Sequence, residues 1–181
     1  YNIGYFGSLE KTKGSKFIIE LSKLDLKNNY YIYGGDKEKI EQIKKENNHK
    51  NLYLSEHVSY KNLKKVINKM DILLMPSSKK ILRSAGGVGN IAKFTSPLKL
   101  FDYLASGKLI ILSNLNVFNE IVKENKNCLI VKKLSLKHWH NVIKNINNNL
   151  RKINLLKRNA YILSKKYTYK IRAKKLLYHI N

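Results

Sequence analysis

One segment of the sequence combines a helix start, a lysine and a carboxylate at spacings suited to a phosphorylated ligand. It runs Ser96-Pro97-Leu98-Lys99-Leu100-Phe101-Asp102-Tyr103-Leu104-Ala105-Ser106-Gly107. Ser96 is a good N-cap and Pro97 a good first helical residue, and the free N–H groups of such a helix start can hold an anion. Asp102 lies about one and a half turns further along, where its carboxylate could accept hydrogen bonds from a diol. On physical grounds alone, an ordinary capped helix with a surface aspartate explains the same residues.

The sequence around this segment alternates short apolar runs with amphipathic stretches. The apolar runs predict strands over residues 2–6, 30–33, 51–54, 71–75, 109–112 and 128–131. The amphipathic stretches predict helices over residues 15–26, 37–46, 61–70, 97–105, 117–123 and 136–150, with a helical remainder to residue 181. Leu24 is expected on the buried face of the first helix, and residues 77–95 on a long polar loop.

Strands that alternate with helices predict a parallel sheet covered on both faces. Right-handed crossovers then give an α/β fold, a doubly wound, Rossmann-like sheet of about six strands with additional C-terminal helices. Ligands of such sheets bind beyond the carboxyl ends of the strands, so the loops after the first, second and fourth strands are the ones of interest. We expect residues 1–181 to form a single domain. Because the chain begins at Tyr1 and not at Met, we interpret it as a piece of a longer protein.

The composition is strongly basic, with a formal net charge of +24 that comes almost entirely from lysine. The mixture of Lys, Asn and Ile is typical of an AT-rich genome, and the lysines recur along the whole chain. A solvated basic surface, attraction to an anionic membrane surface and nucleic-acid binding are the three interpretations. Nucleic acid is the least favoured, because many of the tyrosines fall inside predicted strands.

Cysteine and histidine place further bounds on the chemistry. Cys128 is the single cysteine and lies in an apolar run, so we expect a buried small hydrophobe and a protein of the reducing cytoplasm. One cysteine and five scattered histidines do not make a zinc site, and no metal site is expected. No apolar run approaches the ~20 residues of a membrane-spanning helix.

The segment from Ser96 to Gly107 resembles the donor-site helix of family-4 GT-B glycosyltransferases, where Ser-Pro-Leu-Lys-x-x-Glu-Tyr-x-Ala-x-Gly precedes a strand. The resemblance implies that the helix N-terminus faces the diphosphate of a sugar donor. It also implies that Asp102 binds the ribose hydroxyls. The residues that it assigns to donor binding here are Thr95, Ser96, Pro97, Leu98 and Lys99.

Other segments resemble the same family in the right order, so that the resemblance covers roughly residues 2–131. Tyr5-Phe6-Gly7-Ser8-Leu9 followed by Lys13-Gly14 resembles its first strand and glycine turn, where the lysine contacts the donor phosphates. Tyr33-Gly34-Gly35 resembles its second strand and turn, and Glu56-His57-Val58 the loop that flanks the base. Asp71-Ile72-Leu73-Leu74-Met75-Pro76-Ser77 resembles the strand before the donor loop. Without the resemblance, Lys13 is one surface lysine among many, and His57 is better explained as a loop residue than as a catalytic one.

The sequence departs from the family pattern at two places. Many members carry two glutamates flanking seven residues; the second falls at Asp102, and the first at Phe94, which cannot accept from a sugar hydroxyl. Thr95 or the main chain could hold the sugar instead. Many members also have an arginine after the first glycine, where this chain has Ser8. Lys13, Lys99 or Arg83 could replace that phosphate-neutralising charge.

The resemblance implies a retaining, metal-independent transfer of a hexose-type sugar from a nucleotide sugar to an acceptor hydroxyl, without a cofactor, in cell-surface glycan synthesis. Lys13 and Asp102 are the implied catalytic residues. The acceptor would be held by an N-terminal GT-B domain, so the chain by itself is expected to bind donor weakly and turn over poorly. A cytoplasmic location, at the inner face of the membrane, fits this activity. The alternatives are a non-catalytic basic Rossmann-like module that binds a polyanion or a membrane surface, and a GT-B sugar-nucleotide epimerase.

Overall fold

The computed structural model describes residues 1–9, 14–47, 49–78 and 97–180, and every element below lies in these ranges. Its strands are β1 (Asn2–Phe6), β2 (Asn29–Gly35), β3 (Leu52–Glu56), β4 (Ile72–Met75), β5 (Leu109–Ser113) and β6 (Leu129–Val131). Its helices are α1 (Ser15–Leu24), α2 (Lys37–Glu46), α3 (Tyr60–Asn68), α4 (Leu98–Ser106), α5 (Asn116–Asn119), α6 (Leu136–Lys144), α7 (Leu150–Ser164) and α8 (Tyr169–Ile180). The short 3-10 helices η1 (Ile146–Asn149) and η2 (Lys165–Tyr167) precede and follow α7.

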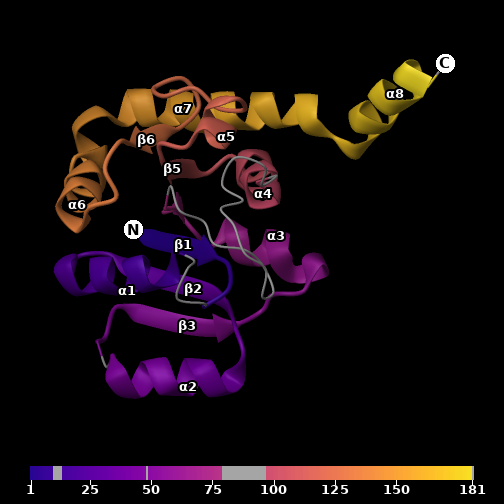
Figure 1. Cartoon of the computed structure of the whole chain (residues 1–181). Helices are drawn as coiled ribbons and strands as arrows, with labels where there is room; N and C mark the ends of the chain where they lie inside the picture. The colour runs from indigo at the N-terminus through magenta and orange to yellow at the C-terminus, as the bar shows by residue number, and fades with distance from the viewer. Residues whose placement is uncertain (10–13, 48, 79–96, 181) are drawn as a thin grey trace.

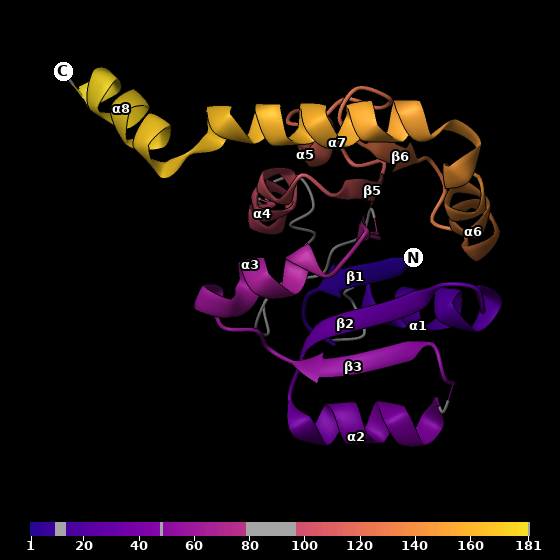
Figure 2. The same ribbon diagram turned by 180° about the vertical axis from the view of Figure 1, so that it is seen from behind.

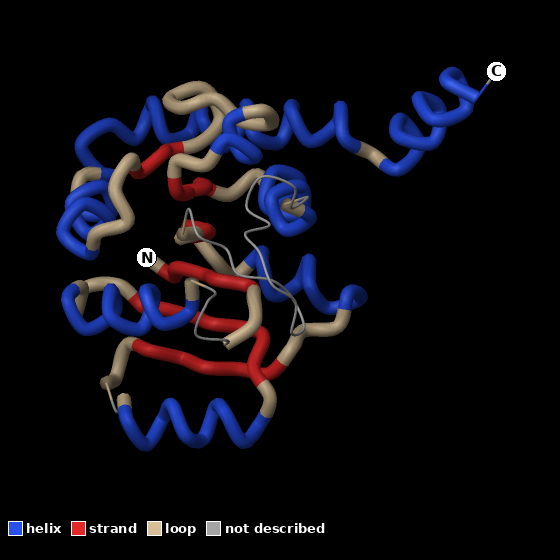
Figure 3. Tube along the Cα trace, in the orientation of Figure 1, coloured by secondary structure: helices blue, strands red, loops and turns tan. Residues whose placement is uncertain are grey.

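The strands form one parallel sheet in the order β3-β2-β1-β4-β5-β6, shown in Figures 1 and 3. The order of the strands reverses between β1 and β4, which gives the sheet a topological switch point at its centre. The α/β, doubly wound, Rossmann-like sheet of six strands that the sequence predicts is therefore confirmed. Ligands of such sheets bind in the crevice outside the carboxyl ends of the strands at this switch point.

Two apolar clusters, one on each face of the sheet, form the core. Alternate residues of β4 and β5 point to opposite clusters, so that both strands are buried at every position. Helices α1, α2 and α6 supply one cluster, and helices α3, α4 and α5 the other. Helix α7 contributes to both: Ile153 and Leu156 join the first cluster and Ala160 the second. The continuous apolar runs of the central strands follow from this burial on two faces.

The C-terminal helices lie outside the sheet. Figures 1 and 2 show α7 along the edge of the molecule opposite α2, and α8 continuing beyond the body of the domain. Among the described helices, none is both long enough and apolar enough to cross a membrane. The additional C-terminal helices predicted from the sequence are therefore present, and α7 is an integral part of the core.

Several helix ends differ from the sequence prediction. Helix α1 ends at Leu24 and not at residue 26, and Leu24 is 48% exposed instead of buried. The cause is Asp25, whose carboxylate accepts hydrogen bonds from the Lys27 backbone N–H and the Tyr30 hydroxyl and so turns the chain toward β2. Helix α5 has one turn in place of the predicted residues 117–123, and α6 ends at Lys144, where the 3-10 turn η1 breaks the predicted helix. The burial of Cys128 is confirmed.

Candidate functional site

Two glycine turns meet at the carboxyl ends of β1 and β2. The Gly7 backbone N–H donates to the Tyr33 carbonyl oxygen at 2.8 Å. Gly34 has a φ of +133°, and a Cβ added to it would lie 2.5 Å from the Gly7 carbonyl oxygen. Only glycine fits such backbone geometry and such a close approach. The backbones of the two glycine turns are therefore in direct contact at the carboxyl ends of β1 and β2.

Helix α4 is attached to the same place by two side chains one turn apart. The Phe6 backbone N–H donates to the Tyr103 hydroxyl oxygen at 3.0 Å, and Tyr103 is buried. The Nζ of Lys99 lies 5.3 Å from the centroid of the Tyr5 ring, in the space that a Cβ on Gly7 would take. Residues four apart on a helix share a face, so Lys99 and Tyr103 approach β1 together. An ammonium group is thus held directly over the first glycine turn.

The loop after β1 also contacts the end of β4. A Cβ on Gly14, the residue before α1, would collide with the carbonyl oxygen of Pro76. The next residue, Ser77, donates its backbone N–H to the Ser113 hydroxyl oxygen at the end of β5, at 2.9 Å. The carboxyl ends of β1, β4 and β5 are therefore joined around the switch point, with the start of α4 beside them.

Asp102 is half-buried on α4, and its burial raises the pKa of its carboxyl above the ordinary value. Leu98 and Lys99 in the first turn are exposed. The helix begins at Leu98 and not at Pro97 as the sequence predicts, and the Pro97 carbonyl oxygen accepts from the Leu100 N–H at 2.8 Å. The shift is one residue, and the N-terminal end of α4, which carries the positive end of the helix dipole, still lies beside the Gly7 turn.

Apart from Pro97, Leu98 and Asp102 of the α4 segment, the predicted donor-site residues divide into three groups. The structure brings Gly7, Gly34 and Lys99 together, with Pro76 against Gly14 beside them and Ser8 following Gly7. His57 and Val58 follow β3, at the same edge of the sheet but two strands away from β1. The predicted positions Lys13, Arg83, Thr95 and Ser96 lie outside the described residues, and so does Phe94, where the sequence departs from the family pattern.

Two tyrosines of the site are not indicated by the sequence pattern. Tyr5 lies under the Lys99 ammonium, and Tyr103 attaches α4 to the Phe6 backbone. The spacing of Lys99 and Tyr103 is the signal that could have revealed the pairing, because it places both side chains on one face of the helix. The partner strand could not be inferred, since it depends on the packing of α4 across β1.

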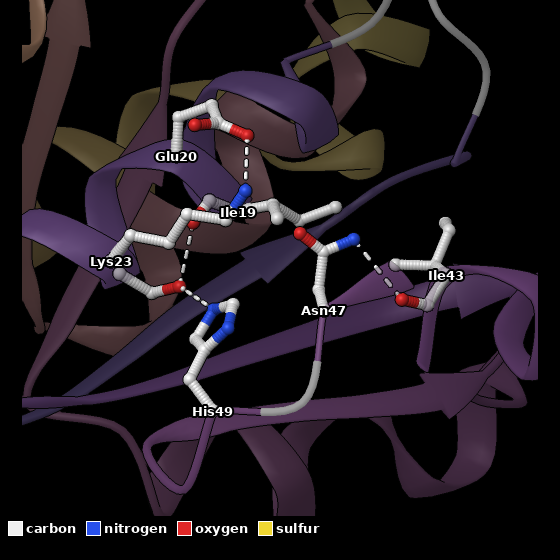
Figure 4. Close-up of polar contacts among 7 residues, drawn as sticks. Ile19, Glu20, Lys23, Ile43, Asn47 and His49 are labelled. Atoms are coloured by element: carbon white, nitrogen blue, oxygen red, sulfur yellow. Dashed lines mark hydrogen bonds and ion pairs between the residues drawn. The ribbon is translucent and has the colours of Figure 1, made fainter. Parts of the chain in front are cut away.

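Other residues with catalytic potential lie elsewhere. The Oγ of Ser22 and the Nε2 of His49 are 2.8 Å apart, and Figure 4 shows His49 beside helix α1. The Ser22 hydroxyl donates its one hydrogen to the Ile19 carbonyl oxygen, so His49 Nε2 must donate to Ser22 and cannot act as its base. His49 lies in the connection between α2 and β3, at the amino ends of the strands, whereas Gly7 follows the carboxyl end of β1. The Ser22–His49 hydrogen bond therefore links α1 to the α2–β3 connection. Among the described residues, no group of three or more His, Cys, Asp or Glu side chains could hold a metal ion.

Comparison with known proteins decides the family. A family model described as glycosyl transferases group 1 matches residues 1–162. The chain belongs to the glycosyl transferases group 1 family. The curated proteins contain no match to this sequence. This glycosyl transferases group 1 chain therefore has the GT-B donor-domain fold that its residues from Ser96 to Gly107 suggest.

Solved structures agree with this assignment. The C-terminal domain of a glycosyl transferase group 1 family protein (LpcC) from Francisella tularensis is 21% identical with a TM-score of 0.70, over 93% of this chain and 87% of that one. Anabaena Alr3699/HepE in complex with UDP and glucose is 12% identical with a TM-score of 0.75, over 99% of this chain and 47% of that one. Sucrose-phosphate synthase from Thermosynechococcus elongatus is 15% identical with a TM-score of 0.76, over 98% of this chain and 44% of that one. This glycosyltransferase chain thus spans less than half the length of the last two proteins.

Proposed function

We propose that this chain binds the donor in a retaining, metal-independent glycosyltransferase that moves a hexose-type sugar from a nucleoside diphosphate to an acceptor hydroxyl in cell-surface glycan synthesis. The proposal places the enzyme in the cytoplasm, at the inner face of the membrane. It assigns the acceptor to an N-terminal GT-B domain, so that the chain by itself turns over poorly. Retention of configuration and the glycan pathway are part of the proposal because the family resemblance implies them.

The position of Lys99 is the observation that carries the proposal. Its ammonium group lies over the Gly7 turn, next to the switch point and one residue into helix α4. A diphosphate that enters this crevice would meet the Lys99 ammonium, the backbone of Gly7 and the N–H groups at the start of α4 at the same time. Lys99 would then supply the positive charge that many relatives place one residue after the first glycine, where this chain has Ser8.

Glycosyl transfer needs such a site because charge develops on the leaving group. The bond between the anomeric carbon and the phosphate oxygen breaks, and its electron pair leaves with the nucleoside diphosphate. Preorganised cations and N–H donors stabilise that charge in the transition state. Lys99, the start of α4 and Lys13, the implied contact in the loop after β1, together supply positive charge for this step without a metal ion.

Asp102 is proposed to accept hydrogen bonds from the ribose hydroxyls, and replacing it by asparagine separates its charge from its shape. We expect Asp102→Asn to weaken nucleotide binding by about 1–3 kcal/mol, because a charged acceptor is lost. Because burial raises the pKa of Asp102, folding disfavours its charged form. Asp102→Asn should therefore increase the free energy of unfolding at neutral pH, and this gain should vanish in acid, where the carboxyl is protonated in both states.

Ligand titrations and thermal unfolding of both proteins across pH check this expectation. A folded Asp102→Asn protein with unchanged nucleotide affinity would remove Asp102 from the ribose role. A stability difference that did not depend on pH would show that the carboxyl is not desolvated.

A thermal-shift screen with UDP, GDP, ADP, TDP and their common sugar conjugates tests the proposed function. At a ligand concentration of ~100 times the dissociation constant, binding should stabilise the fold by ~2.7 kcal/mol. Stabilisation by one nucleotide would support donor binding and identify the base. If no nucleotide stabilises the chain while polyanions do so in a salt-dependent way, the basic-module alternative gains the support instead. Interconversion of a bound sugar nucleotide without an acceptor would favour the epimerase.

A further inference from the structure

The net positive charge of the chain is concentrated toward its C-terminus, because all of the acidic residues lie before this part. Glu124 is the last acidic residue of the sequence, and fifteen lysines and arginines follow it. Ten of these basic residues lie between Arg151 and Lys175, in and around helices α7 and α8. This part of the molecule therefore presents positive charge that no acidic residue of the same segment offsets.

Helix α7 has one buried face and one outward face. Ile153, Leu156 and Ala160 pack into the core. On the opposite side, Leu155 and Ile162 are 54% and 51% exposed, and their spacing of seven residues places them on the same face. A single exposed aliphatic residue is common on protein surfaces, whereas two on one outward face form a small apolar patch that can contact a partner.

Basic residues surround these two aliphatic side chains. Arg151 and Arg158 lie four residues before and three residues after Leu155, and both are exposed. Lys165 and Lys166 follow in η2, three and four residues after Ile162, and are exposed as well. We call this surface the α7 outer face; it consists of Arg151, Leu155, Arg158, Ile162, Lys165 and Lys166.

We propose that the α7 outer face binds the surface of a membrane that contains anionic phospholipids. A helix lying in the plane of such a membrane inserts its apolar side chains at the level of the headgroups, while its lysines and arginines contact the lipid phosphates. The α7 outer face has both components. A nucleic-acid backbone would bind the basic side chains of this face but would leave the exposed Leu155 and Ile162 without a contact. The membrane surface is therefore the better partner.

This orientation leaves the donor site open. Helix α7 and helix α2 lie at opposite ends of the molecule in both Figure 1 and Figure 2. Strands β1 and β4, whose carboxyl ends carry the donor site, lie between these two helices in Figure 1. A membrane against α7 would thus run beside the crevice without covering it. The inference does not depend on glycosyl transfer, and its test uses binding alone.

Flotation of the purified 181-residue protein with vesicles tests the proposal. Vesicles of phosphatidylcholine with and without phosphatidylglycerol are compared at low and at physiological salt. We expect binding that requires phosphatidylglycerol and weakens with salt. Arg151→Gln with Arg158→Gln should reduce it by about thirtyfold, the combined effect of two basic side chains at an anionic surface. Lys44→Gln with Lys45→Gln on α2 removes the same charge from exposed positions at the far end of the molecule, and should leave binding nearly unchanged.

A second pair of variants tests the apolar component. Leu155→Ser with Ile162→Ser should reduce vesicle binding while the net charge and the folded core are unchanged, because both side chains lie outside the core. Leu24→Ser with Leu26→Ser, also exposed, is the matched control. The proposal fails if the protein does not float with anionic vesicles at low salt. It fails also if the lysine substitutions on α2 reduce vesicle binding as much as the arginine substitutions on α7. It also fails if the serine pair binds like the original protein, which would indicate non-specific attraction to any polyanion, RNA included.

Discussion

Replacing Lys99 by alanine is expected to weaken the binding of a nucleoside diphosphate by about 2 kcal/mol, or roughly thirtyfold, while the nucleoside without phosphates binds as before. The reason is the place of the ammonium group over the Gly7 turn, where it would contact phosphate and not base or ribose. In a complete enzyme, turnover should fall by about a hundredfold, since the same charge stabilises the leaving diphosphate.

Calorimetric titration with the nucleotide that the screen identifies, and with its nucleoside, measures this difference. Lys44→Ala, an exposed lysine of α2 far from the crevice, controls for the general loss of one positive charge. Loss of the contact with the Tyr5 ring costs Lys99→Ala some stability, but that cost affects both ligands equally. Equal weakening of nucleoside and diphosphate would show that Lys99 shapes the fold of the crevice and does not bind phosphate.

The fold was largely predictable because the strongest sequence signals come from the most buried elements. Strands β4 and β5 are buried at every position because both of their faces are covered, and apolar runs this short favour strands over helices. Helix ends were less predictable, because polar groups distant in sequence decide them. Asp25 ends α1 by accepting from the Tyr30 hydroxyl, and an apolar periodicity contains no information about that contact.

The site was predictable to a smaller extent. The resemblance assigned Gly7, Gly34 and Lys99 to a single ligand, and these three residues do lie together. The sequence did not indicate how they are held in place. That depends on the hydrogen bond between the Phe6 N–H and the Tyr103 hydroxyl and on the Tyr5 ring beneath Lys99, which are contacts between elements more than ninety residues apart. Packing across the sheet determines such contacts, and neither spacing nor residue type specifies it.

The contact between the two glycine turns leads to the largest expected effect on stability. We expect Gly34→Ala to lower the free energy of unfolding by about 2–6 kcal/mol. Its φ of +133° is unfavourable for alanine, at a cost of roughly 1–3 kcal/mol, and the new Cβ would press on the Gly7 carbonyl oxygen, at a similar cost. Because that oxygen belongs to the backbone, no side-chain rotation can relieve the overlap. Urea denaturation measures the change.

Gly107→Ala provides the matched control, because Gly107 ends α4 with a φ of +65° and its nearest neighbour to an added Cβ is 3.7 Å away. Gly107→Ala should lower the free energy of unfolding by about 1–2 kcal/mol, from backbone strain alone. The excess loss in Gly34→Ala then measures how tightly β2 holds the Gly7 turn, and so how rigidly the main chain beneath Lys99 is fixed. If the two variants lose equal stability, the two glycine turns can separate at little cost. The Gly7 backbone beneath Lys99 would then not be fixed in place before a phosphate group binds.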